Sequence, residues 1–91
     1  MKKMRRLIDL VSVGPATVED LSLLGIYSVD DLIDCEAEEL HERLCFLTGK
    51  KHCVCVLDVF ESAIAQAKDP DLPREKCQWN YYSKLRKQAR L

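Results

Sequence analysis

The sequence predicts an all-α protein: a bundle of about five short helices, followed by a basic C-terminal tail or a further helix. Apolar residues recur three and four positions apart through most of the 91 residues, which is the period of an amphipathic helix. Residues 53–60 are rich in β-branched side chains, but their helical stripe continues to Ala67 and no second strand candidate is available to pair with them. The helical interpretation is therefore favoured throughout.

The first two helices are expected to flank a tight turn. A short first helix ends near Ser12, with its apolar stripe on Met4, Leu7, Ile8 and Val11. In the turn that follows, Gly14 permits a positive φ and Pro15 suits the first position of a new helix. The second helix has its expected buried face on Val18, Leu21 and Leu24.

A short third helix is predicted from the signals around its start. Gly25 is expected to end the second helix, and Ile26 can then fold back over the last turn. Residues 28–31 resemble a capping box, with acids near the positive end of the helix dipole. The expected inner face of this helix consists of Val29, Leu32 and Ile33.

Two longer helices complete the predicted bundle. The fourth runs from about Glu36 and closes at Gly49, with its apolar face on Ala37, Leu40, Leu44 and Leu47. The fifth is the longest, and its stripe consists of Cys53, Val56, Leu57, Phe60, Ala63, Ile64 and Ala67. Residues 69–73 contain two prolines and break the chain.

Charge divides the chain into a domain (1–73) and a basic, aromatic tail (74–91). Residues 1–6 carry four basic residues and no acids, whereas residues 7–73 carry fourteen acidic residues against four basic ones. The tail carries six basic residues, interleaved with Trp79, Tyr81 and Tyr82. Two readings stay open: the aromatic residues anchor a terminal helix on the domain, or the tail is an arm that binds nucleic acid.

The informative motif is the turn with its two flanking helices. Residues 10–21 read LVSVGPATVEDL, and LGI at 24–26 and SVDDL at 28–32 follow. This pattern resembles a helix-hairpin-helix motif. The resemblance implies that backbone N–H groups at the start of the second helix grip a phosphate oxygen of duplex DNA, because helix N-termini offer unpaired donors and a positive dipole end.

The remainder of the domain resembles a degenerate second copy. A shift of 35 residues sets Gly49 on Gly14, which predicts a tandem helix-hairpin-helix (SAM-like) bundle. Along residues 7–67 the chain is most similar to the small bacterial proteins of the pathogenicity-locus family, particularly at EELHERLC (38–45) and VLDVF (56–60). A weaker likeness is to the C-terminal domain of competence regulators of the TfoX kind. Neither resemblance implies an enzyme activity.

Two features depart from the pattern of a strong DNA binder. Ser12 replaces the glycine usual at its position, which restricts a positive φ there. Glu19 and Asp20 would repel DNA if they faced it. The candidate DNA contacts are accordingly the two turns, namely Ser12, Val13, Gly14, Pro15, Ala16, Thr17, Gly49, Lys50 and Lys51.

Other kinds of site find less support. Five cysteines cannot all pair, so we expect buried thiols rather than disulfides. A zinc site would draw on His41, Cys45, His52, Cys53, Cys55 and Cys77, but Cys53 and Cys55 would point apart on a helix. No catalytic constellation is present, so neither an enzyme activity nor a cofactor or metal is expected.

The chain is expected to be cytoplasmic, because its longest uncharged stretch of nine residues is too short to span a bilayer. We therefore expect a non-enzymatic module that binds double-stranded DNA without sequence preference, through the backbone of its hairpins and the nearby lysines. The alternative is a protein-interaction module on the same scaffold, with an unidentified protein partner and no nucleic acid.

Overall fold

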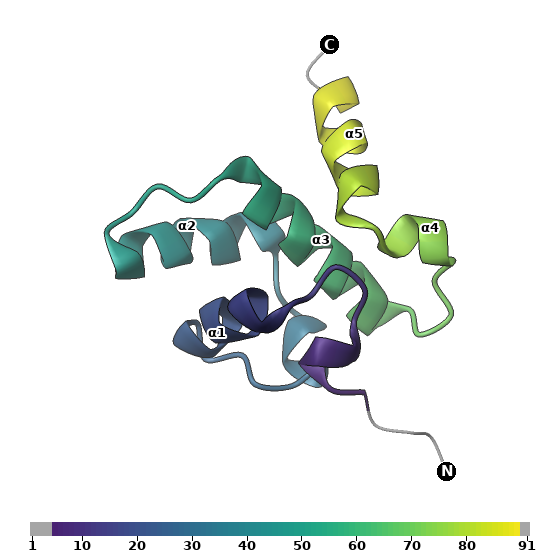
Figure 1. The fold of residues 1–91 in the computed structure, drawn as a ribbon, viewed down its shortest axis with the longest axis horizontal. Helices are drawn as coiled ribbons and strands as arrows, with labels where there is room; N and C mark the ends of the chain where they lie inside the picture. The colour runs from purple at the N-terminus through teal and green to yellow at the C-terminus, as the bar shows by residue number, and fades with distance from the viewer. Residues whose placement is uncertain (1–4, 90–91) are drawn as a thin grey trace.

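The computed structural model describes residues 5–89 and is helical, with no strand among these residues. Within these residues, five α-helices and two 3₁₀ turns follow one another (Figure 1). Their bounds are η1 Leu7–Asp9, α1 Pro15–Leu23, η2 Asp30–Leu32, α2 Ala37–Thr48, α3 Val54–Lys68, α4 Arg74–Cys77 and α5 Trp79–Ala89. The all-α prediction is confirmed, and so is the helical interpretation of residues 53–60.

The predicted first helix is wrong in its extent. Only the 3₁₀ turn η1 forms between Arg5 and Val11, and Met4 lies outside the described residues. Asp9 folds back on Arg6, whose backbone N–H donates to the Asp9 carboxylate at 2.9 Å. Because Leu10 already has an extended backbone, the apolar stripe is cut short, and Ile8 is exposed while Leu7 and Leu10 enter the core.

Local signals gave the ends of α1 and the start of η2 correctly. Gly25 has a φ of 80°, and its N–H and that of Ile26 donate to the carbonyls of Ser22 and Leu21, as in a Schellman motif. Ser28 and Asp31 form the predicted capping box through reciprocal side-chain to backbone bonds at 3.3 and 3.1 Å. These hydrogen bonds span at most five residues, so the local sequence suffices to specify them.

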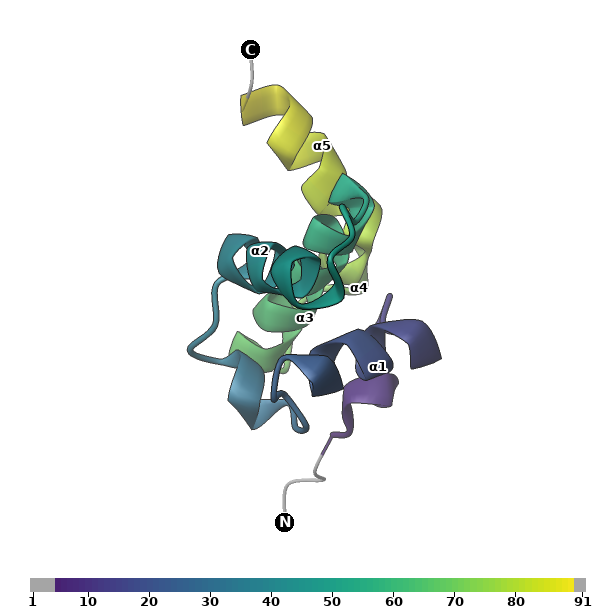
Figure 2. The same ribbon diagram turned by 90° about the vertical axis from the view of Figure 1, so that its left-hand side faces the viewer.

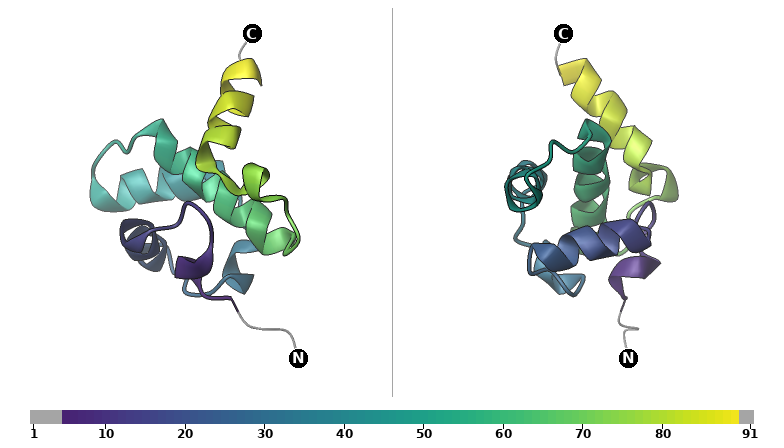
Figure 3. Two further views of the ribbon diagram at one scale, coloured as in Figure 1. Left: turned by 45° about the vertical axis from the view of Figure 1, so that its right-hand side comes forward. Right: turned by 60° about the vertical axis from the view of Figure 1, so that its left-hand side comes forward.

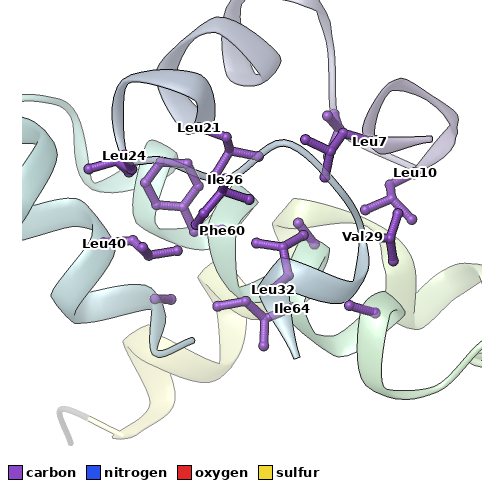
Figure 4. Packing of buried hydrophobic residues seen from close by; sticks show 14 of the residues in the cluster. Leu7, Leu10, Leu21, Leu24, Ile26, Val29, Leu32, Leu40, Phe60 and Ile64 are labelled. Carbon is purple, nitrogen blue, oxygen red and sulfur yellow. The ribbon is translucent and has the colours of Figure 1, made fainter. Parts of the chain in front are cut away.

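The core lies between α3 and the elements that precede it. Phe60 of α3 is fully buried among Leu21, Leu24 and Ile26 (Figure 4). Helix α3 runs through the middle of the molecule, and Figure 2 shows α2 and α1 on successive levels beside it. Besides Ile8, three residues of the predicted apolar faces are exposed, namely Ile33, Leu47 and Cys53. Ile33 and Cys53 lie just outside their helices, and Leu47 lies at the outer edge of the apolar stripe of α2.

The chain after Asp69 forms helices α4 and α5, and the N-terminal part of α5 packs on α3 while its far end extends away from the body (Figure 3). The contact is closed by a bidentate ion pair in which Arg86 donates from Nε and Nη2 to the Asp58 carboxylate, at 3.1 and 3.0 Å. Asp58 is only 1% exposed. The C-terminal helix is therefore anchored to the domain by charge as well as by packing.

Candidate nucleic-acid interface

The first turn (residues 10–14) joins η1 to α1 and is held from beneath by Gln66 of α3. The backbone N–H of Val11 donates to Gln66 Oε1, and Gln66 Nε2 donates to the carbonyl of Val11, both at 2.9 Å. The Gln66 amide thus pairs with Val11 as a neighbouring strand would. Because Gln66 is only 5% exposed, these bonds are shielded from water and fix the position of the turn.

A buried polar network connects this clamp to the C-terminal helices. Gln66 Nε2 also donates to Ser62 Oγ at 3.0 Å, and the Ser62 hydroxyl donates to the carbonyl of Cys77 at the end of α4. No buried side-chain polar atom within residues 5–89 lacks a partner. A fully satisfied network of this kind specifies one arrangement of the turn, α3 and α4.

Ser12 corrects the sequence-based expectation for the turn. The left-handed conformation belongs to Ser12, with a φ of 69°, whereas Gly14 has an extended backbone with a φ of −107°. A non-glycine residue with positive φ is strained. Here the Ser12 hydroxyl offsets that strain, since it accepts from the N–H of Trp79 at 3.0 Å and lies 3.5 Å from the Cys77 carbonyl.

The turn presents the N-terminus of α1 to solvent. Pro15 stands at the first helical position, as predicted, and no side chain caps the helix. Within the described part of the chain, the N–H groups of Ala16 and Thr17 have no hydrogen-bond partner, and the first turn of α1 carries no acidic residue. Such an end attracts anions. Of the predicted contacts here, Val13 offers only its backbone, because its side chain is buried.

The second turn (residues 49–53) joins α2 to α3. Gly49 ends α2 as predicted and has a φ of 66°. His52 fastens the turn to α2: its backbone N–H donates to Cys45 Sγ at 3.4 Å, and its Nε2 lies 2.8 Å from Thr48 Oγ1. Because the Thr48 hydroxyl already donates to the Leu44 carbonyl, His52 Nε2 is the donor in that contact. Lys50 and Lys51 are exposed at the tip.

The two turns lie at opposite ends of α3. The first packs on Gln66 and the second leads into Val54, so they are separated along the helix axis by about 18 Å. The predicted contacts therefore form two groups, Ser12–Thr17 and Gly49–Lys51, and the structure does not merge them into one site. Gly14 and Gly49, which the sequence analysis set on one another, differ in backbone conformation, because Gly49 has a positive φ and Gly14 is extended.

Some residues of the predicted basic and aromatic tail make contacts within the fold, and others are exposed. Tyr81 and Tyr82 are half-buried and pack edge to face, with ring centroids 5.1 Å apart. Arg86 is held by Asp58, whereas Lys84 and Lys87 face solvent on α5. Trp79 is 41% exposed, and Arg90 lies outside the described residues.

Sequence reasoning missed the residues that hold the first turn and the last helix. Asp58, Ser62 and Gln66 recur every four positions on α3, so they form one polar stripe on a helix that is otherwise rich in apolar residues. All three are buried. That regular interruption of an apolar helix was the available signal, although the sequence does not reveal which distant groups pair with it.

Three further properties bear on the kind of site. Within residues 5–89, no group of three or more His, Cys, Asp or Glu side chains is placed to hold a metal ion. All five cysteines are free thiols, but only Cys77 is buried, so the expectation of buried thiols is wrong for the other four. No helix of the described chain is long and apolar enough to cross a bilayer.

Fold and turns together define a small all-helical protein in which two braced turns each lead into a helix N-terminus. The chain belongs to the pathogenicity locus family, whose model matches residues 1–88. It is also similar to the mitomycin resistance protein McrB of Streptomyces lavendulae, with 33% identity over 81 residues, which is 89% of this chain and 73% of that protein. No solved structure matches the chain.

Proposed function

We propose that this protein is a non-enzymatic, tandem helix-hairpin-helix module that binds double-stranded DNA without sequence preference. The observation that carries the proposal is the open N-terminus of α1, where the N–H groups of Ala16 and Thr17 are unpaired within the described chain. A helix end of this kind suits a phosphate oxygen and ignores the base. Gln66 and Ser12 hold the turn in place, so little ordering is needed when DNA binds.

The second turn supplies positive charge for the proposed DNA binding. Lys50 and Lys51 are exposed on a turn that His52 fastens to α2, so their ammonium groups extend from a defined backbone. Because the two turns lie at opposite ends of α3, the module can touch phosphates at separate places along a duplex. Binding that depends on phosphates should weaken steeply between about 50 and 200 mM salt and respond little to base sequence.

Gly14 gives the direct test, because it is the N-cap of α1 and has room for a side chain. A Cβ at this position would meet no atom within 4 Å, and its extended backbone suits any residue. Gly14→Asp should cap the helix and set a carboxylate where the phosphate would bind. Gly14→Asn is the matched control with the same shape and no charge, and Gly14→Ala leaves the N–H donors open.

The measurement is duplex affinity at low salt, alongside thermal melting. We expect Gly14→Asp and Gly14→Asn to melt at or slightly above the parent temperature, and Gly14→Ala to melt within a few degrees of it, because alanine is a poorer N-cap than glycine but restricts the unfolded chain. Affinity should fall at least about tenfold for Gly14→Asp, less for Gly14→Asn, and by under about threefold for Gly14→Ala. A Gly14→Asp protein that binds duplex DNA as tightly as the parent would exclude the α1 N-terminus as the contact.

A second candidate function is protein interaction, and an exposed apolar surface on α2 favours it. Phe46 is 87% exposed and Leu47 56%, and with Glu42 and Arg43 they line an open hollow of about 440 Å³. An acid and a base beside two apolar side chains make a self-complementary surface, so the fitting occupant is a second copy of this chain. Sedimentation over a concentration series tests this: concentration-dependent dimers that Phe46→Ser abolishes support it, and a monomer throughout excludes it.

A further inference from the structure

Cys53 and Cys55 meet at the start of α3. Cys53 is not part of the helix, as the sequence suggested, but its N-cap, with an extended ψ of 146°. Its sulfur therefore turns back over the first turn and accepts a hydrogen bond from the backbone N–H of Cys55 at 3.5 Å. Cys55 is the second residue of the helix, and the Cys53 sulfur lies within reach of both its backbone N–H and its thiol, so the two side chains do not point to opposite faces.

The surroundings give the two thiols different properties. Hydrogen bonds from the thiol and then the backbone N–H of Cys55 lower the pKa of Cys53, and they outweigh the opposing effects of burial and of the Asp58 carboxylate. The pKa of Cys55 is raised, first because its thiol donates to Cys53 and then because of burial. Cys53 is exposed, whereas Cys55 is half-buried. An accessible thiol with a lowered pKa beside a partner thiol with a raised pKa is the arrangement of a nucleophile and a resolving thiol.

The other cysteines lack this arrangement. The Cys35 thiol donates to the backbone carbonyl of Asp31 at 3.1 Å, and burial raises its pKa. Cys77 is buried and donates to the carbonyls of Leu72 and Pro73, and burial raises its pKa as well. Cys45 accepts a hydrogen bond from the His52 N–H as part of the second turn. Reactivity should therefore concentrate at Cys53.

We propose that Cys53 and Cys55 form a dithiol site that reduces small-molecule disulfides, with Cys53 as the nucleophile and Cys55 as the resolving thiol. The Cys53 thiolate attacks one sulfur of glutathione disulfide, the bond between the two glutathione sulfurs breaks, and one glutathione thiolate leaves and takes up a proton. Cys55 then gives up its proton and attacks the Cys53 sulfur, and the second glutathione leaves with that proton. Two electrons pass from the protein to glutathione disulfide, which becomes two thiols.

Backbone geometry permits the product. Cys53 and Cys55 flank one helical residue, Val54. The rise and radius of an α-helix place the Cα atoms of two such flanking residues about 5.4 Å apart. That separation lies within the range found in disulfides. Cys53 lies ahead of the helix at an exposed end, where its side chain is not packed in the core and can rotate toward Cys55.

The test incubates the fully reduced protein with glutathione disulfide, quenches free thiols with an alkylating agent, and maps the peptides by mass spectrometry. We expect a disulfide between Cys53 and Cys55. Cys55→Ser should instead accumulate one glutathione on Cys53, Cys53→Ser should form neither product, and the control Cys35→Ser should behave as the parent. Ser is itself a good N-cap, so Cys53→Ser should fold, which circular dichroism verifies.

A second readout separates this reactivity from general thiol exposure. With limiting iodoacetamide at neutral pH, Cys53 should be alkylated first, and the rate should reach half its maximum at a lower pH than for Cys35. Adducts that fall first on Cys45 or Cys35, or a first disulfide between any other pair, would overturn the proposal. Neither readout involves DNA, so the result is independent of the proposed DNA binding.

Discussion

The hydroxyl oxygen of Ser12 accepts a hydrogen bond from the backbone N–H of Trp79, 67 residues later in the chain, at 3.0 Å. Trp79 is the first residue of α5, and the first N–H groups of a helix have no partner within it. Ser12 therefore acts as a distant cap for α5 while it holds the left-handed conformation of the first turn. The shape of the proposed phosphate site thus depends on the C-terminal helices.

Substitutions of Ser12 should separate backbone strain from this hydrogen bond. Ser12→Ala keeps the positive φ but loses the acceptor for Trp79, so it should lower the free energy of unfolding by about 1 kcal/mol. Ser12→Gly loses the same bond but relieves strain of about 1 kcal/mol, so it should stay within about 0.5 kcal/mol of the parent. Urea denaturation measures both values. A glycine variant less stable than the alanine variant would mean that strain at Ser12 is unimportant.

Gln66 should be the residue on which the first turn depends most. Gln66→Leu fills the same space but leaves the N–H and carbonyl of Val11 without partners, which should cost about 2–4 kcal/mol. Hydrogen exchange at the Val11 amide should accelerate beyond what global destabilisation explains. The matched control is Gln88→Leu on the exposed face of α5, where the change should be within about 0.5 kcal/mol. Equal effects of the two substitutions would contradict the clamp.

Local features of this fold could be read from the sequence because their contacts are local. The helix end at Gly25 and the capping box of Ser28 and Asp31 close within a few residues, and Pro15 fits the start of α1 by its own geometry. The positive φ in the first turn went to Ser12 instead of Gly14 because a partner far along the chain stabilises it. Glycine permits such a conformation but does not require it.

The candidate site also combines features that could be predicted from the sequence with features that could not. The exposed lysines and the open helix start were visible in the sequence, as positions 50 and 51 beside a glycine and as a Gly-Pro turn. The clamp by Gln66 and the anchor of Arg86 on Asp58 could not be found, since they join residues 55 and 28 positions apart. The cysteine pair was missed because the sequence pattern placed Cys53 inside the helix. The helix begins one residue later, at Val54, so Cys53 is its N-cap.

Removing Arg86 alone should destabilise the protein more than removing both charges of the ion pair between Asp58 and Arg86. Arg86→Met leaves the Asp58 carboxylate buried without a cation, which costs a protein about 3–5 kcal/mol, and the partial exposure of Arg86 places the expected value at the lower end. The double variant Asp58→Asn with Arg86→Met removes the orphaned charge and should recover at least half of the lost stability. Thermal melts of the parent, Arg86→Met, Asp58→Asn and the double variant measure the coupling energy between the two side chains. If the double variant is no more stable than Arg86→Met, the buried charge is not the cause of the loss.

Reversing the charge at the tip of the second turn should weaken DNA binding without disturbing the fold. Lys50 and Lys51 are exposed, and the bonds that fix the turn involve His52 instead, so Lys50→Glu with Lys51→Glu should melt within a few degrees of the parent. Duplex affinity at low salt should fall about tenfold or more, and the slope of log affinity against log salt should shrink by about two phosphate contacts. The matched control, Lys84→Glu with Lys87→Glu on α5, changes the net charge equally at another exposed place. If both double variants lose affinity to the same extent, the loss reflects net charge, and the second turn makes no specific contact with phosphate.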